Sequence, residues 1–109
     1  MARPPIKRVT VAELRELFNR EILPKVSKGE LIEIVRSEGT PQQRANQPAG
    51  TRSQIVEYFG SAGGHLEKVA IVHRYLRPDG SLGGSGKPDP KRILHDGIMF
   101  APQLKKPAS

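Results

Sequence analysis

Hydrophobic residues near the start of the chain recur at the spacing of an amphipathic helix. Thr10 and Glu13 have the three-residue separation of a capping box, in which each side chain accepts a hydrogen bond from the backbone of the other residue. Pro24 has no backbone N–H and is predicted to end this helix. The apolar face of the predicted helix consists of Val11, Leu14, Leu17, Phe18 and Ile22.

The same signals recur a few residues later and predict a second helix. Ser27 is placed to cap this helix, Glu30 to complete a second capping box, and Gly39 to end the helix in a left-handed conformation. The predicted apolar face consists of Leu31, Ile34 and Val35. Two helices joined by a short link are therefore expected within residues 10–38.

The hydrophobic pattern changes from a helical to an extended period in the second half of the chain. Residues 39–52 have no apolar periodicity and predict a loop, whereas 53–59 and 68–76 are rich in β-branched and aromatic residues. These two stretches predict an antiparallel hairpin, and Asp96-Gly97 predicts a second, tight one. The predicted fold is α+β, with two N-terminal amphipathic helices packed on a three- to four-stranded antiparallel sheet.

Length and composition limit this fold to one domain. The chain has 109 residues, of which 36% are hydrophobic, and this supplies one modest core. We expect a basic arm at 1–8, a single domain at 9–101 with its sheet at 53–101, and a flexible tail at 102–109. The absence of cysteine excludes disulfides and thiolate metal sites, and no apolar run approaches the ~20 residues of a membrane span. These features predict a soluble, cytoplasmic protein.

The charge balance points to the class of partner. Eighteen lysines and arginines against eleven aspartates and glutamates give a net charge of +7, with a sequence pI near 10.2. Residues 65–109 hold eight of the basic and four of the acidic residues, so the C-terminal part carries most of the excess. RNA or DNA is the partner that such a balance favours.

A loop rich in glycine and proline lies inside this basic part. Residues 78–92 contain four glycines and three prolines, and the backbone N–H groups of such a segment can form an anion-binding nest. Tyr58, Phe59 and Tyr75 are expected to stack on unpaired bases if they face outward, whereas their alternative place is the core, where Phe59 is expected. The leading hypothesis is a nucleic-acid-binding module that contacts phosphates through the basic residues around this loop. These residues are Arg74, Arg77, Lys87, Lys91 and Arg92.

Two sharper motifs lie in the same segment. A phosphate-binding P-loop is excluded because five residues separate Gly80 from Gly86-Lys87 and Pro88 replaces the required serine or threonine. Pro78-Asp79 followed by Asp89-Pro90-Lys91 resembles the PD-(D/E)xK pattern of metal-dependent nucleases, and the resemblance implies a divalent cation held by the two acids. However, the prolines on both sides of Asp89 are unsuited to the strand on which that family carries its second acid.

An enzymatic alternative uses histidine in place of a metal. His73 beside Glu57 on the neighbouring strand suits acid–base cleavage of RNA, and the predicted outline is similar to that of several small bacterial ribonuclease toxins. His65, His73 and His95 lack the spacing of metal ligands, so no metal or other cofactor is expected. A third reading is a protein-interaction adaptor of phage or plasmid origin that docks through its helix pair or a strand edge. The binding module is favoured over the enzyme.

Overall fold

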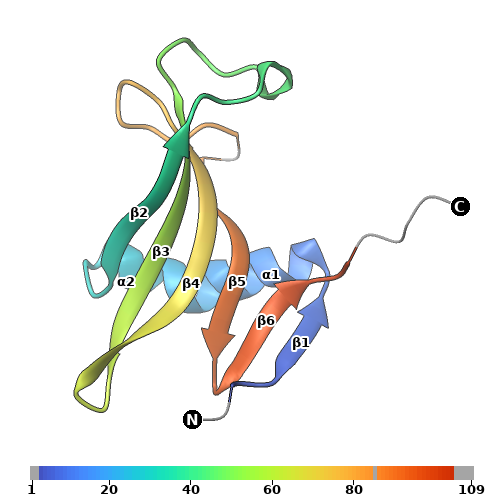
Figure 1. Ribbon diagram of the computed structural model, residues 1–109, viewed down its shortest axis with the longest axis vertical. Coiled ribbons are helices and arrows are strands. Elements are labelled where there is room, and N and C mark those ends of the chain that lie inside the picture. Colours follow the sequence, from blue (N-terminus) through green and yellow to red (C-terminus); the bar gives the residue numbers. More distant parts are fainter. Residues whose placement is uncertain (1–2, 85, 105–109) are drawn as a thin grey trace, which may run out of the picture.

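The fold is described from a computed structural model, which describes residues 3–84 and 86–104 (Figure 1). Within these residues the chain forms one helix, six strands and one short 3-10 turn. The helix consists of α1 (Val11–Leu17), a π-helical turn (Phe18–Ile22) and α2 (Leu23–Ser27), and the 3-10 turn is Gln43–Ala45. The strands are β1 (Ile6–Val9), β2 (Ile32–Gly39), β3 (Arg52–Ala62), β4 (His65–Leu76), β5 (Asp89–His95) and β6 (Ile98–Pro102).

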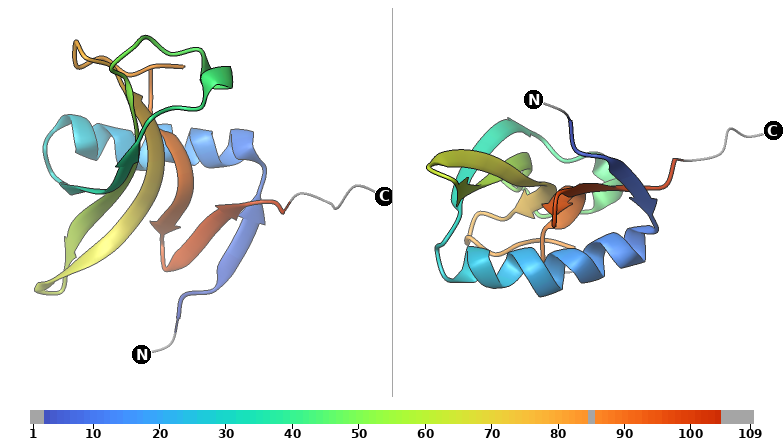
Figure 2. Two further views of the ribbon diagram at one scale, coloured as in Figure 1. Left: turned by 45° about the horizontal axis from the view of Figure 1, so that its top comes forward. Right: turned by 90° about the horizontal axis from the view of Figure 1, so that it is seen from below.

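The six strands form a single mixed sheet in the order β1-β6-β5-β4-β3-β2. Each pair of neighbours is antiparallel except β1 and β6, which run parallel. The helix runs along one face of this sheet, as the right panel of Figure 2 shows. The predicted fold class was therefore wrong, because residues 3–84 and 86–104 form one helix of 17 residues and six strands instead of two helices and three or four strands.

The start of the helix follows the predicted capping box. The Thr10 hydroxyl accepts a hydrogen bond from the Glu13 backbone N–H at 3.1 Å, and the Glu13 carboxylate accepts one from the Thr10 N–H at 3.0 Å. The N–H of Thr10 holds the pKa of Glu13 below its usual value. Two of the backbone donors that a helix start leaves unpaired are therefore satisfied within the motif.

The helix does not end at Pro24, because the turn before this residue is π-helical. The Leu23 N–H bonds the carbonyl of Phe18, five residues back, so the hydrogen-bond register is already shifted where the proline lacks its donor. The helix continues to Ser27 and closes with a Schellman motif at Gly29, whose φ is +69°. In this motif the Glu30 N–H bonds the Lys25 carbonyl at 2.9 Å. The predicted second capping box is thus the C-terminal cap of the first helix.

Strand β2 occupies the segment that was predicted to be the second helix. Ile32, Ile34 and Val35 are β-branched, and such residues favour an extended backbone when a neighbouring strand can pair with them. The long strand β3 is that neighbour, and it pairs with β2 from Ile32 to Gly39. The prediction failed because a short apolar run fits helical and extended periods equally well.

Strand β1 adds a strand at one edge of the sheet that the sequence did not predict. Residues 6–9 pair in parallel with the C-terminal strand, so part of the basic arm expected at 1–8 is a sheet edge. This pairing joins residues more than 90 positions apart, and no local pattern signals it. Of the tail expected at 102–109, residues 105–109 lie outside the described residues.

The core lies between the helix and the sheet. Phe18 is fully buried on the helix, and it packs in one cluster with side chains from four strands. Tyr58 is buried in this cluster and donates a hydrogen bond to Glu33 at 3.2 Å, while burial raises its pKa to about 12. Phe59, expected in the core, is half-buried beside the Lys68 ammonium instead. The sheet members of the core are Val9, Val56, Tyr58, Ala70, Val72 and Ile93.

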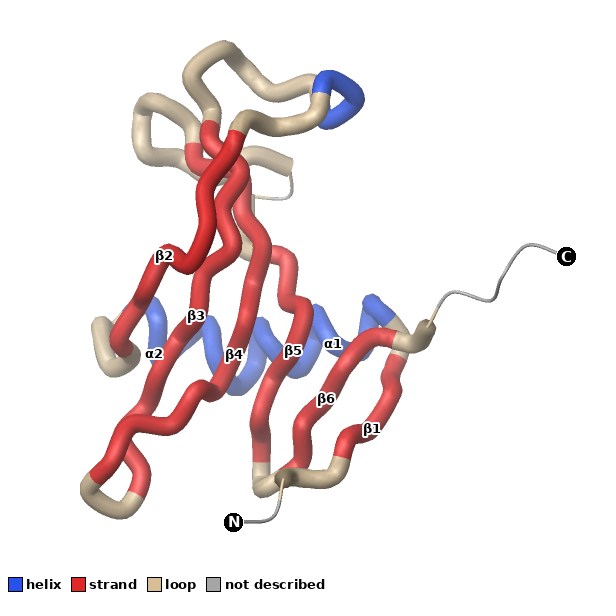
Figure 3. The backbone as a smooth tube through the Cα atoms, viewed as in Figure 1, coloured by secondary structure: helices blue, strands red, loops and turns tan. Residues whose placement is uncertain are grey.

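The predicted hairpins at 53–76 and 93–100 are confirmed. Strands β3 and β4 pair antiparallel, and the Asp96-Gly97 turn has positive φ at both residues, which matches the twist of a two-residue hairpin. Strands β2, β3 and β4 extend beyond the helix and carry the loop 40–51 and the described parts of the β4–β5 loop, 77–84 and 86–88, at one end of the sheet (Figure 3). In the part of the chain described, no helix is long and apolar enough to cross a membrane.

Candidate functional site

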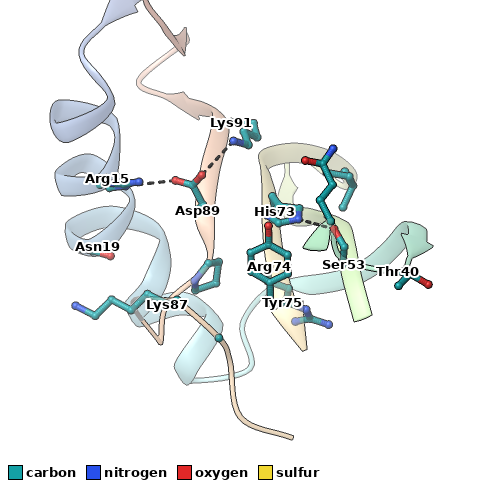
Figure 4. Close-up of a pocket in the computed structure, with 15 residues that line it drawn as sticks. Arg15, Asn19, Thr40, Ser53, His73, Arg74, Tyr75, Lys87, Asp89 and Lys91 are labelled. Atoms are coloured by element: carbon teal, nitrogen blue, oxygen red, sulfur yellow. Dashed lines mark hydrogen bonds and ion pairs between the residues drawn. The ribbon is translucent and has the colours of Figure 1, made fainter. Parts of the chain in front are cut away.

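A cleft of about 860 Å³ lies where the two long loops meet the helix and the extended end of the sheet. Its walls come from α1 and the π-helical turn, from β3, β4 and β5, and from both loops (Figure 4). Four cationic residues and one acidic residue line it: Arg15, Arg74, Lys87, Lys91 and Asp89. The Arg74 guanidinium is paired with Glu33 on the other face of the sheet, which leaves three cationic side chains against one carboxylate, an excess of two positive charges.

The strand register gathers the polar side chains of the cleft on one face of the sheet. Ser53 on β3 pairs with Tyr75 on β4, and His73 on β4 pairs with Asp89 on β5. Because side chains alternate between the faces of a strand, His73 and Tyr75 point to the same side. Arg74 lies between them and directs its guanidinium to the other face. There it donates a hydrogen bond to Gln54 and forms an ion pair with Glu33.

His73 is the most closely surrounded titratable group in the cleft. Its Nε2 lies 2.7 Å from the Ser53 hydroxyl oxygen, and its ring meets the Tyr75 ring edge-on with 4.6 Å between centroids. Burial lowers the pKa of His73 below its usual value, Lys91 lowers it further, and Asp89 opposes the shift. The lowered pKa favours the neutral imidazole, which is the form that accepts a proton.

Asp89 joins the helix to the sheet inside the cleft. Its carboxylate accepts a hydrogen bond from the Arg15 guanidinium at 3.3 Å and from the Lys91 ammonium at 3.0 Å. Burial raises the pKa of Asp89, but Lys91 and Arg15 outweigh burial and leave the pKa below its usual value. A single carboxylate thus holds two cations close together, and one positive charge in this trio is not neutralised.

The remaining basic residues predicted to bind phosphates lie outside the cleft. Arg77 donates a hydrogen bond to Gln47 of the neighbouring loop at 3.3 Å. Arg92 is exposed on β5, opposite Ile71. The structure therefore brings together Lys87, Lys91 and Tyr75 from the predicted set, together with the backbone segment that carries Arg74.

Glu57 shares a sheet face with His73 but does not line the cleft. Its carboxylate is buried between the Arg36 guanidinium at 3.1 Å and the Lys68 ammonium at 2.5 Å. The hydrogen bond from Lys68 lowers the pKa of Glu57 against the effect of burial, and Arg36 adds to the lowering. This carboxylate is an ionised acceptor that ties β2, β3 and β4 together.

The two acids of the motif that resembles PD-(D/E)xK lie in different parts of the structure. Asp79 accepts hydrogen bonds from the backbone and the hydroxyl of Ser81, which stabilise the Arg77–Gly80 turn, and it does not line the cleft. Asp89 is held by Arg15 and Lys91. Among residues 3–84 and 86–104, no group of three or more histidine, aspartate or glutamate side chains is placed to hold a metal ion.

Sequence reasoning missed five polar residues of the cleft, which are Arg15, Asn19, Thr40, Gln42 and Ser53. Arg15 and Asn19 are four positions apart on the helix, beside its apolar face, so helical spacing places them on a common edge. Ser53 and Thr40 gave no signal of their own, because serine and threonine are ordinary loop and strand residues. Only the three-dimensional register connects them to His73.

Comparisons of the chain with models of protein families, with curated proteins and with solved structures found no match.

Proposed function

We propose that this protein binds nucleic acid, with a single-stranded segment of RNA or DNA in the cleft. The observation that carries this proposal is the convergence of Arg15, Lys87 and Lys91 on one cleft, from the helix, the loop and a strand. Affinity of proteins for nucleic acid comes mostly from such neutralisation of phosphates. The excess positive charge of the cleft supports the same class of ligand.

The aromatic side chains of the cleft favour an unpaired strand over a duplex. Tyr75 and His73 lie edge to face on the same side of β4, next to the cations (Figure 4). Bases of a single strand stack on aromatic rings, whereas bases inside a duplex are covered by their neighbours. Thr40, Gln42 and Asn19 add hydrogen-bonding groups around this pair of rings.

Fluorescence anisotropy with a labelled 12-nucleotide strand tests this proposal. We expect affinity to fall steeply with salt, and Lys87→Gln to weaken binding and to reduce the slope of log K against log salt by about 1. Lys25→Gln, on the exposed side of α2, removes the same charge away from the cleft and serves as the matched control. Equal losses in both variants, or no binding at low salt, would contradict the proposal.

A further inference from the structure

Two groups that can exchange protons, the Ser53 hydroxyl and the Tyr75 phenol, belong to side chains in contact with the His73 imidazole. We propose that the protein cleaves RNA in this cleft without a metal ion, with His73 as the general base and Tyr75 as the general acid. This proposal rests on the proposed function. The Ser53 hydroxyl, 2.7 Å from Nε2, fixes the orientation of the imidazole and is a positioning residue. The Tyr75 ring, in edge contact with the imidazole, brings a second proton-carrying group to the same place.

The proposed step balances protons within this pair. His73 takes the proton of a ribose 2′-hydroxyl, a bond forms from the 2′-oxygen to the adjacent phosphorus, and the bond from phosphorus to the 5′-oxygen breaks. The Tyr75 phenol gives its proton to the leaving 5′-oxygen. The products are a 2′,3′-cyclic phosphate and a 5′-hydroxyl end, and the proton on His73 returns to Tyr75 through solvent.

Cations next to the base stabilise the charge that develops on the phosphate. Lys91 and Arg15 share the Asp89 carboxylate, and Asp89 pairs directly with His73 across β4 and β5. When a phosphate lies between His73 and these cations, Arg15 or Lys91 exchanges its contact with Asp89 for a contact with a phosphate oxygen. Positive groups that are held beside the reacting phosphate stabilise the charge that develops in the transition state.

The lowered pKa of His73 favours the neutral imidazole, which a general base requires. Its lowered pKa follows first from burial and then from Lys91. Glu57 has no part in the step, because its carboxylate is held by Arg36 and Lys68 away from the cleft. The catalytic pair therefore differs from the pair of His73 and Glu57 that the sequence suggested.

Cleavage and binding are measured separately on the full chain. A 5′-labelled RNA is incubated with the protein in EDTA and analysed on a gel, while binding is measured with a 2′-O-methyl strand of the same sequence. We expect the RNA to be cut to 2′,3′-cyclic phosphate ends. In His73→Gln we expect the cleavage rate at saturating protein to fall by about 100-fold or more, a loss larger than the fall in affinity for the 2′-O-methyl strand.

Two further variants keep the test decisive. Tyr75→Phe retains the ring and loses the phenol, so it tests the step even if His73→Gln does not fold, and we expect a rate loss of about tenfold or more. His95→Gln, whose histidine pairs with Asp96 outside the cleft, is the matched control and should cut like the wild type. Intact RNA despite binding of the 2′-O-methyl strand, or equal cutting by all variants, would overturn the catalytic proposal alone. Failure to bind that strand would instead overturn the proposed function.

Discussion

At the scale of single residues, the properties of His73 depend on charges from several elements. Burial and the Lys91 ammonium favour the neutral imidazole, and the Asp89 carboxylate favours the charged one. The polar and charged groups around it are Ser53 on β3, Tyr75 on β4, Asp89 and Lys91 on β5, Arg15 on the helix and Lys87 on the loop. Of these charges, Lys91 lowers the pKa of His73 and Asp89 raises it, and the effect of Lys91 is the larger.

Replacement of Lys91 should therefore raise the pKa of His73. Lys91→Gln removes the ammonium that lowers the pKa of His73. It also removes the Lys91 ion pair of Asp89, whose carboxylate raises that pKa. A titration of the imidazole protons by NMR measures the change, with His95 in the same spectra as an internal reference. An unchanged or lower pKa of His73 would show that the Lys91 charge does not reach the imidazole.

The same shift links His73 to stability. Because the folded protein binds this proton less readily than the unfolded chain does, the contribution of His73 to stability is present above its unfolded pKa near 6.5. It is lost as the pH falls through 6.5 towards the lowered folded pKa. Protonation of His73 therefore opposes the fold on the acid side of neutrality.

At the scale of elements, the end of the helix decides the course of the chain. The Schellman motif requires a positive φ at Gly29, and the chain then turns back to form β2 along the sheet edge. A side chain at such a position meets its own backbone. The cap therefore depends on glycine.

We expect Gly29→Ala to lower the free energy of unfolding by about 1 kcal/mol, measured by urea denaturation. Gly39→Ala is the matched control, because Gly39 lies in β2 without a positive φ and has open space around it. The loss at Gly29 should clearly exceed that at Gly39. Similar values for the two variants would mean that the left-handed cap has no special role.

Local signals predicted some elements and failed for others. The capping box at Thr10, the β3–β4 hairpin and the Asp96-Gly97 turn are encoded within a few residues, and the structure confirms them. The helix cap at Gly29 was misread, because its serine and glutamate also fit a helix start. Strand β1 gave no signal, because its pairing with β6 joins the two ends of the chain.

At the scale of the whole molecule, the cleft gathers side chains that lie far apart along the chain. Arg15 belongs to the helix, Ser53 to β3, and Lys87 to the loop that leads into β5. Sequence reasoning identified the basic loop and His73 from composition and residue type. It could not find Arg15 or Ser53, because their place in the cleft depends on the packing of the helix and on the register of β3.

Mapping of NMR chemical shifts determines whether nucleic acid binds in this cleft. A ¹⁵N-labelled sample is titrated with an unlabelled 2′-O-methyl strand. We expect the largest amide shifts at cleft residues such as Ser53, Tyr75 and Lys91, with little change at the β3–β4 turn (63–64) at the far end of the sheet. Shifts spread over the other lysines and arginines, with the cleft residues unchanged, would contradict binding in the cleft.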